Sequence, residues 1–318
     1  MKRQITHAFV FLFLFVVSYQ FLDNPYSSTY FETIRNDAFE TLSTADSLYL
    51  EIKRKAPLYE EDPIDAIIDP IWKAIPGYNG VKVDVQKSYE KMKKEKTFDE
   101  KKLIYTEQKP KITLKDLKPA PIYKGNPKKQ MVAFQVNVAW GNDYLLDLLK
   151  TFKKHHIHVT FNLDGSWTKN HPRLAKMIAE AGHEIGNHGY SHPDFQKLSS
   201  QEIRKQLKMT NDIIEATVKQ TPKWFAPPSG SYNDRTVQIA RELNLGTILW
   251  TIDTVDWKNP DPYEMANRVI RESHAGAMIL MHPTKATSQA LDYMIEGIER
   301  KGLKISTVSE LLNEKRLD

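Results

Sequence analysis

The chain has 318 residues, which is long enough for one domain of about 200 residues and a smaller second one. It contains no cysteine, and this excludes disulfides, thiolate metal ligands and thiol nucleophiles. The net charge of +5 is modest, and the lysines are scattered among acidic residues rather than clustered with aromatic ones, so the composition argues against nucleic-acid binding.

The first 22 residues have the layout of a secretory signal. Lys2 and Arg3 precede an apolar run from Ala8 to Val17. No small-x-small cleavage motif follows, and the run is shorter than the ~20 residues of a typical membrane span. Residues 1–22 therefore predict export to the cell envelope or the medium, and both a cleaved signal peptide and an uncleaved membrane anchor stay open.

Residues 23–116 predict a small α/β accessory domain without recognisable chemistry. Within it, Asp62 to Ile75 predicts a short helix, and the alternation of Val81, Val83 and Val85 predicts a half-buried strand followed by a lysine-rich helix. Residues 117–130 hold three prolines and a glycine, which is typical of a stiff polar linker.

Between residues 131 and 318, strand-like apolar runs alternate with helical patterns. This alternation predicts a parallel sheet with helices outside it, arranged as a barrel or as an open doubly wound sheet. The strand candidates are Val132–Val138, Val159–Leu163, Trp224–Ala226, Gly246–Ile252 and Ala277–Met281. The helix candidates are Tyr144–Lys154, Pro172–Ala181, Ser200–Val218, Thr236–Leu243, Tyr263–Arg271 and Gln289–Lys301.

Four short motifs follow one another in this half of the chain. His188 and His192 stand four residues apart in a polar segment, a spacing that lets two imidazoles hold one metal ion. They are followed by F-A-P-P-S-G at 225–230, D-T-V-D-W at 253–257 and L-M-H at 280–282. Their order and spacing resemble those of the polysaccharide deacetylases of carbohydrate esterase family 4, the NodB-homology domains. The resemblance covers roughly residues 131 to 312.

The stretches V-N-V-A-W-G-N, F-A-P-P-S-G-S and M-I-L-M-H-P-T look most like a sporulation-associated subgroup of this family from Bacillus. The resemblance implies a distorted (β/α) barrel of the NodB-homology type, preceded by the small accessory domain, with the site at the strand ends. It also implies an N-acetylated cell-wall glycan, peptidoglycan or chitin-like, as the partner, and a divalent metal, with zinc as the usual choice.

Amide hydrolysis needs a Lewis acid, a base, an oxyanion donor and an acid for the leaving amine. By resemblance, His188 and His192 are metal ligands and His282 is the acid. Asp253 and Asp256 stand where the family places the carboxylate that orients this acid. The substrate-binding positions that match are Pro227, Pro228, Ser229, Trp257 and Leu280, of which the Ser229 turn offers a backbone N–H to the oxyanion.

The first motif departs from the family. The family has T-F-D-D-G, whose two aspartates are the base and the third metal ligand, but residues 135–141 are Q-V-N-V-A-W-G. Alignment from Val132 puts Asn137 and Val138 at these positions, and alignment back from Gly141 puts Ala139 and Trp140 there. Neither register restores a carboxylate, so the metal is expected to be weakly bound or absent. The arginine of the family's third motif is also replaced, by Ala226.

Two functions remain open from the sequence. One is metal-dependent deacetylation of cell-wall glycan, impaired by the loss of the aspartate pair, because general-base assistance is typically worth ~10²–10⁴-fold in rate. The other is a pseudoenzyme that uses the same groove to bind glycan or a wall-assembly partner.

Overall fold

The computed structural model of the protein describes residues 47–317, so the predicted signal segment 1–22 lies outside the described residues. The described chain divides into two compact units, one made of residues 47–61 and 81–106 and the other of residues 62–80 and 107–317. This division differs from the predicted boundaries at 116 and 130, because residues 62–80 and 107–130 pack with the larger unit. Among the described residues, no helix is both long and apolar enough to cross a membrane.

The smaller unit is an α/β structure, as predicted. It contains the helix α3 (Ser47–Lys55), the two-stranded sheet of β3 (Gly80–Val83) and β4 (Tyr105–Gln108), and the helix α4 (Val85–Met92). Asp84 begins α4 by accepting a hydrogen bond from the backbone N–H of Lys87. The apolar faces of these elements form its core, which consists of Leu48, Ile52, Ala56, Val83, Met92 and Leu103.

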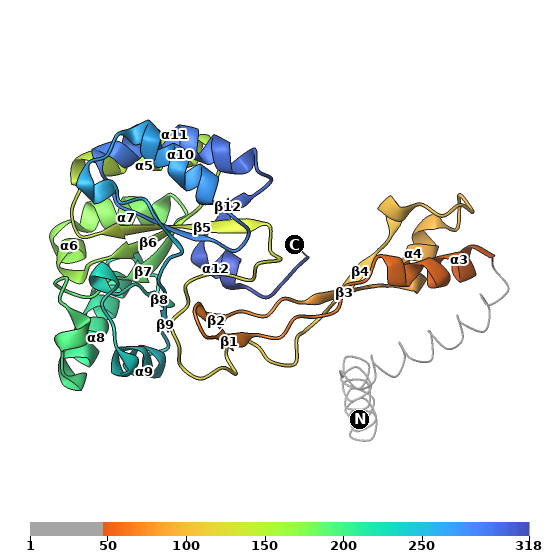
Figure 1. Ribbon diagram of the computed structural model, residues 1–318, viewed down its shortest axis with the longest axis horizontal. Coiled ribbons are helices and arrows are strands. Elements are labelled where there is room, and N and C mark those ends of the chain that lie inside the picture. Colours follow the sequence, from red (N-terminus) through yellow and green to blue (C-terminus); the bar gives the residue numbers. More distant parts are fainter. Residues whose placement is uncertain (1–46, 318) are drawn as a thin grey trace, which may run out of the picture. The chain divides into compact units, whose positions relative to one another are not determined.

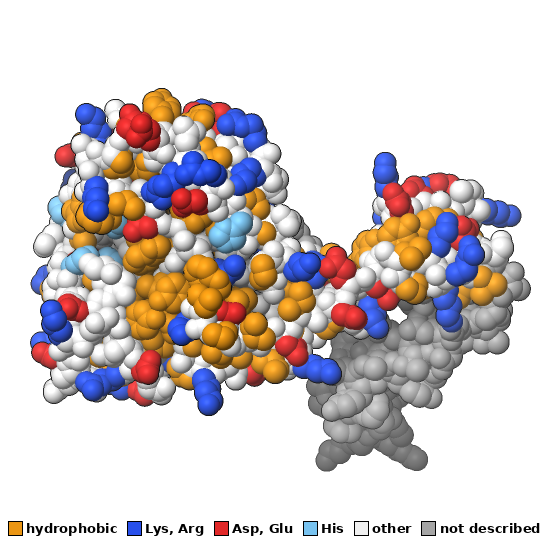
Figure 2. All heavy atoms as spheres, viewed as in Figure 1, with side chains coloured by type: hydrophobic (Ala, Val, Ile, Leu, Met, Phe, Trp, Pro, Cys, Tyr) orange, Lys and Arg blue, Asp and Glu red, His pale blue; other side chains and the backbone are white. Residues whose placement is uncertain are grey.

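The helix predicted between Asp62 and Ile75 is wrong. The segment forms an antiparallel hairpin of β1 (Ile67–Asp69) and β2 (Lys73–Ile75). The side chain of Asp69 accepts hydrogen bonds from the backbone N–H groups of Ile71 and Trp72, and this local turn competes with a helix. Figure 2 shows hydrophobic side chains gathered over the region of β1, β2 and the strand β9 (Gly246–Thr247), and Ile67, Ile68 and Ile71 of the hairpin are exposed.

The larger unit is built on an eight-stranded sheet whose paired strands all run parallel. The strand order is β10-β11-β5-β6-β7-β8-β9, and β12 pairs with β5. The sheet curls into a half-barrel, which confirms the predicted barrel type over the open doubly wound alternative. Its strands are β5 (Met131–Val138), β6 (Thr160–Leu163), β7 (Glu184–Asn187), β8 (Trp224–Phe225), β9 (Gly246–Thr247), β10 (Ile252–Asp253), β11 (Met278–Met281) and β12 (Lys304–Ser306).

Helices cover the outer face of this sheet, with α5, α10 and α11 layered on one side of it in Figure 1. Ser199 begins the longest helix through a capping box with Glu202, and that helix spans the residues predicted for it. The helices are α5 (Asn142–Lys154), α6 (Gly165–Asn170), α7 (Pro172–Glu180), α8 (Ser200–Val218), α9 (Asp234–Glu242), α10 (Pro262–Glu272), α11 (Lys285–Glu299) and α12 (Val308–Leu312).

The central strand β5 separates two environments, because successive side chains of a strand point to opposite faces. Its even-numbered residues, among them Phe134 and Val138, belong to the large core between the sheet and the helices. Ala133 belongs instead to a cluster with Ala226, Ile248 and Met278 on the inner face. Asn137 shares this inner face, so β5 points an amide toward the inside of the half-barrel at its carboxyl end.

Candidate functional site

The carboxyl ends of four strands place the predicted residues at one end of the sheet. Asn137 is the second-last residue of β5, His188 follows β7, Asp253 ends β10, and His282 follows β11. This is the end at which barrel folds carry their sites. The site has two sides, which differ in chemistry.

The first side, here called the acid half, consists of Asp256, His282 and Thr287. The carboxylate of Asp256 is buried, and its Oδ1 lies 2.8 Å from His282 Nδ1. Its Oδ2 accepts hydrogen bonds from the backbone N–H of His282 (2.6 Å) and from the hydroxyl of Thr287 (2.6 Å). Because the carboxylate accepts at Nδ1, this nitrogen carries a proton and Nε2 is left for the site.

Asp253 has a different place from Asp256. Its Oδ1 accepts a hydrogen bond from the backbone N–H of Val255 at 2.8 Å, within its own loop. Arg268 holds the same loop by donating to the carbonyl oxygens of Asp253 and Thr254 at 2.9 and 2.8 Å. The carboxylate that orients His282 is therefore Asp256, and Asp253 shapes the D-T-V-D-W loop.

This loop carries backbone strain. Val255 has a φ of 54°, in the left-handed region that costs a β-branched residue of order 1–3 kcal/mol. The bonds from Arg268 and Asp253 hold the strained turn, and the turn leaves Trp257 55% exposed. Trp257 is thus accessible to solvent, and the amine of Lys258 lies 4.9 Å from the centroid of its ring. Leu280, in contrast, is buried on β11 beside Gln135 of β5.

Trp140 adds an aromatic surface that the motif comparison does not single out. Its ring stacks on His282 with centroids 5.6 Å apart and planes inclined by 11°, and 46% of the residue is exposed. Gly141 makes the approach of this segment to β11 feasible, because a Cβ there would lie 2.1 Å from the carbonyl oxygen of Pro283. Gly141 also has a φ of 87°, which favours glycine.

The second side, here called the base half, consists of Asn137 and Asn162. These residues are direct neighbours on β5 and β6, and the Nδ2 of Asn162 donates to the Oδ1 of Asn137 at 2.8 Å. Asn162 is fully buried, and its own Oδ1 has no hydrogen-bond partner among the described residues. A Cβ on the next strand, at Gly186, would lie 2.1 Å from that oxygen. Two amides therefore occupy the position where a proton acceptor is needed.

His188 is buried with a defined tautomer. Its Nδ1 lies 2.7 Å from the carbonyl oxygen of Ala226, so Nδ1 donates and Nε2 is left with its lone pair. Burial, with smaller contributions from the neighbouring imidazoles of His192 and His282, lowers the pKa of His188 from 6.5 to about 3. The ring is therefore a neutral nitrogen donor at pH 7, as a metal ligand must be.

His192 completes the imidazole pair from an exposed loop. Its ring centroid is 5.2 Å from that of His188, and its backbone N–H donates to Asp164 at 3.1 Å. Gly189, where the family has serine or threonine, has a φ of 73° and donates its N–H to Asn187 Oδ1 at 2.8 Å. Gly189 has no hydroxyl to hold the loop, but the backbone N–H groups of Gly189 and His192 hold it through these two hydrogen bonds.

The Pro-Pro turn forms the short helix η4 (Pro228–Gly230). Ser229 has a φ of 53°, and the N–H groups of Gly230 and Ser231 donate to the carbonyl oxygens of Pro227 and Pro228 at 2.9 Å each. The main chain thus fixes this turn beside Ala226, the residue that accepts from His188.

Comparisons with known proteins agree with this geometry. A profile described as polysaccharide deacetylase matches residues 124–248. A peptidoglycan-N-acetylglucosamine deacetylase from Bacillus cereus is 31% identical over 61% of this chain and 72% of its own. The chain belongs to the polysaccharide deacetylase family. An uncharacterised protein from Bacillus subtilis is 50% identical over 97% of both chains.

Among solved structures, a carbohydrate esterase family 4 pseudoenzyme from Bacillus anthracis matches with a TM-score of 0.81 and 52% identity, covering 86% of this chain and 97% of that one. A mutant of that pseudoenzyme described as having restored enzymatic activity matches with the same TM-score and 51% identity, covering 86% of this chain and 100% of that one.

Deacetylases of this family depend on a metal, and the described residues do not fit a catalytic metal site. Across residues 47–317, no three side chains of His, Cys, Asp or Glu are grouped to hold one ion. A catalytic zinc site usually has three protein ligands, whereas only the two imidazoles are present here. The nearby Asp164 is engaged by Ser166 and by the backbone N–H groups of Trp167 and His192.

Asn162 and Thr287 are the site residues that sequence reasoning misses. They contact Asn137 and Asp256 across 25 and 31 residues of chain, so no local pattern marks them. Trp140 is named by one of the two alignment registers, but its stacking on His282 is not predicted from the sequence.

Proposed function

We propose that this chain is a catalytically degenerate polysaccharide deacetylase that binds N-acetylated cell-wall glycan outside the cytoplasm. The observation that carries the proposal is the amide pair of Asn137 and Asn162 at the base position. An amide does not accept a proton at neutral pH, and a missing general base removes a rate factor of typically ~10²–10⁴. The absence of a fitting third metal ligand among the described residues should lower the hydrolytic rate further.

The acid half supports a retained binding role. Asp256 still orients His282, and Trp140 and Trp257 expose aromatic faces in the loops around it. Sugar rings pack on such faces, and their hydroxyl groups can bond to the exposed edge of His282. Several relatives are named as peptidoglycan deacetylases, which favours peptidoglycan as the glycan.

A binding experiment tests this role. The full chain is mixed with insoluble peptidoglycan, and the bound fraction is measured after sedimentation. Trp257→Ala and Trp140→Ala should each weaken binding by about two- to tenfold, since aromatic contacts are worth ~0.5–1.5 kcal/mol. Tyr263→Ala, which removes an aromatic residue 57% exposed on α10, is the matched control. Equal binding by all four proteins would contradict a glycan-binding role of the candidate site.

The second candidate function is residual metal-dependent deacetylation of the same glycan. The intact contact between Asp256 and His282 favours it, because protonation of the leaving amine requires an imidazole that is held in place. Release of acetate from peptidoglycan at saturating zinc separates the two functions. Robust release by the unaltered chain would favour the enzyme, and binding without release would favour the degenerate form.

Export of the chain is the part of the proposal that rests on sequence. Lys2, Arg3 and the apolar run 8–17 predict it, and a cell-wall substrate requires it. Fractionation of cells that express the full chain checks the location. Recovery entirely in the cytoplasm with an intact N-terminus would contradict export, whereas recovery with the membrane would identify an uncleaved anchor. The Bacillus-like motifs further suggest a role in sporulation.

A further inference from the structure

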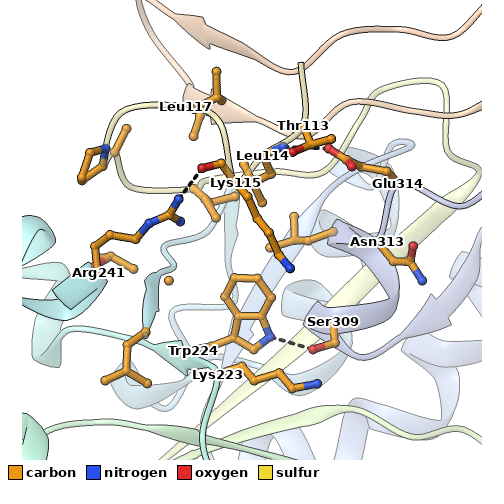
Figure 3. A pocket seen from close by; sticks show the side chains of 18 of the residues that line it. Thr113, Leu114, Lys115, Leu117, Lys223, Trp224, Arg241, Ser309, Asn313 and Glu314 are labelled. Carbon is orange, nitrogen blue, oxygen red and sulfur yellow. Dashed lines mark hydrogen bonds between the residues drawn. The ribbon is translucent and has the colours of Figure 1, made fainter. Parts of the chain in front are cut away.

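A cavity lies at the opposite end of the sheet from the candidate site. Its volume is about 900 Å³, within the range of small-molecule pockets. Lys223 and Leu245, which line it, directly precede β8 and β9, so the cavity is at the amino ends of these strands. The segment 109–122 and the end of the chain from Ser309 to Lys315 provide its other walls (Figure 3).

Trp224 gives this cavity an aromatic surface that is held in place. Its Nε1 donates to the hydroxyl of Ser309 at 2.8 Å and to Glu184 at 3.2 Å. Gly246 on the neighbouring strand leaves room for the indole, because a Cβ there would lie 2.5 Å from the ring. The other apolar lining residues are Ala74, Leu114, Leu117, Pro119, Ala120, Ile122, Val237, Leu245 and Leu312.

The charged residues of the lining are nearly all cationic. There are six positive charges and one negative charge, which leave a net charge of +5, and the residues are Lys109, Lys115, Lys118, Lys223, Arg241, Lys315 and Glu314. The single carboxylate is engaged, because Glu314 accepts a hydrogen bond from the backbone N–H of Leu114 at 2.8 Å. A cavity whose lining has this net positive charge attracts anions.

Two of these cations, Lys115 and Lys223, lie beside Trp224 in Figure 3, and Arg241 lies farther from the indole. Figure 3 shows the amine of Lys115 pointing into the cavity, with Lys223 and Arg241 at its border. Arg241 donates one N–H to the carbonyl oxygen of Lys115 at 2.6 Å, which ties the segment 109–122 to α9. Thr247 also lines the cavity, and its buried hydroxyl has no hydrogen-bond partner within residues 47–317. Buried hydroxyl groups without a hydrogen-bond partner are rare in proteins, so the hydroxyl of Thr247 is available to a polar group bound in the cavity.

From this combination we propose that the cavity binds a single-chain anionic amphiphile, with its apolar body on Trp224 and its anionic head among Lys115, Lys223 and Arg241. A neutral apolar ligand would leave the cations unused, and a free inorganic anion would leave the aromatic and aliphatic surface uncovered. The head can be a carboxylate or a phosphate, since both accept hydrogen bonds from lysine and arginine. This cavity is separate from the candidate glycan-binding site at the carboxyl ends of the strands, and its proposed ligand does not depend on that site.

Calorimetric titration of the full chain with four probes tests the site. The probes are decyl phosphate, decanoate, inorganic phosphate and decyl maltoside, each below its micelle concentration. One or both of the anionic amphiphiles should bind with a stoichiometry of one, and the better of the two identifies the head group. Inorganic phosphate and the neutral maltoside should each bind at least about tenfold more weakly. Equal binding of decyl maltoside would overturn the proposal.

Matched variants locate the binding. Lys115→Glu/Lys223→Glu should weaken the anionic amphiphile by at least about tenfold, because two attractive charges become repulsive. Lys176→Glu/Lys205→Glu makes the same change in net charge at exposed lysines of α7 and α8 outside the cavity, and should leave affinity unchanged.

Gly246→Ala tests the apolar surface separately, because a methyl group there displaces the indole of Trp224. Its thermal unfolding is measured beside its affinity, and weaker binding by a folded variant supports the site. Equal affinities for the two double lysine variants would show that the amphiphile binds elsewhere and would sink the assignment.

Discussion

On the β10–β11 side of the candidate site, Asp256 accepts three hydrogen bonds and fixes the acid His282, whereas on the β5–β6 side Asn162 and Asn137 share one. Both sides belong to the same sheet and lie at its same end. The acid half contains a carboxylate bonded to an imidazole, whereas the base half contains two bonded amides and no carboxylate. The comparison shows that one end of a sheet can hold a carboxylate–imidazole pair on one side and only neutral amides on the other.

The largest effect is expected at Val138, which one of the two alignment registers puts at the second position of the aspartate pair. Its side chain is fully buried in the core between the sheet and the helices, on the face opposite to Asn137. Val138→Asp should lower the free energy of unfolding by about 3–5 kcal/mol, because a carboxyl group would lie there without a partner. Urea unfolding measures the loss.

Asn137→Asp is the control for this change, since it keeps the acceptor for Asn162 Nδ2 and should cost far less. If Val138→Asp were as stable as this control, Val138 would face the site, and the base half would be closer to a metal site than described.

The pH dependence of stability tests a residue outside both halves of the site, His183. His183 is buried against Phe152 and Phe161, and its Nδ1 accepts from the backbone N–H of Val159 at 3.2 Å. Burial, with a smaller contribution from His158, lowers the pKa of His183 from 6.5 to about 4. Between pH 6.5 and about 4, the imidazole of His183 therefore binds a proton in the unfolded chain but not in the folded one.

Stability should accordingly fall by about 3 kcal/mol more in the wild type than in His183→Asn as pH drops from 6.5 to 4. Asparagine preserves an acceptor for Val159 but does not titrate. Unfolding in urea at several pH values gives the dependence of the unfolding free energy on pH for each protein. The difference between the two dependences cancels the contribution of carboxylates that titrate in the same pH range. Parallel slopes would show that His183 is not the neutral buried group described.

Asp256→Asn should cost about 2 kcal/mol, since hydrogen bonds to a charged group are worth ~1.5–3 kcal/mol each. Asp253→Asn removes one charged acceptor of a backbone N–H and should cost less. The contrast tests which of the two aspartates supports the acid half. Thermal unfolding ranks the variants, and an equal or larger loss at Asp253 would reverse the roles assigned to them.

The smallest expected signal is zinc binding. Two neutral imidazoles without a third ligand should bind zinc weakly in calorimetry, and His188→Ala or His192→Ala should abolish the binding. His171→Ala, a histidine outside the pair, is the control. Tight binding that survives both changes in the pair would place a metal elsewhere and remove the contrast between the two halves.

Local patterns predict much of this molecule. The amphipathic pattern and Ser199 give the bounds of α8, and the alternation at residues 81–85 anticipates β3. The strand β7 is missed, because its four residues include Gly186 and lack an apolar run. The hairpin 67–75 is mistaken for a helix, because its apolar spacing fits both and its partner, Ile122, is distant in sequence.

The candidate site is predictable to the extent that motifs carry it. The positions of His188, His192, Asp256 and His282 follow from the family resemblance, and their strand-end placement agrees with the structure. The choice of Asp256 over Asp253, by contrast, depends on the path of a strained loop held by Arg268. The cationic cavity around Trp224 is assembled mainly from three separate segments, 109–122, 223–247 and 309–315, so sequence spacing does not reveal it.

The most direct test of the central claim measures acetate released from chito-oligosaccharides at saturating zinc by wild type, Asn137→Asp and Asn137→Ala. Asn137→Asp restores a proton acceptor with little change in shape and keeps the bond from Asn162. A related pseudoenzyme has a mutant described as regaining activity, which makes a gain feasible in this fold. We predict little or no release by wild type and Asn137→Ala, and a measurable gain by Asn137→Asp. Robust wild-type turnover that Asn137→Ala leaves unchanged would contradict the assignment of Asn137 to the base position and the degenerate character of the site.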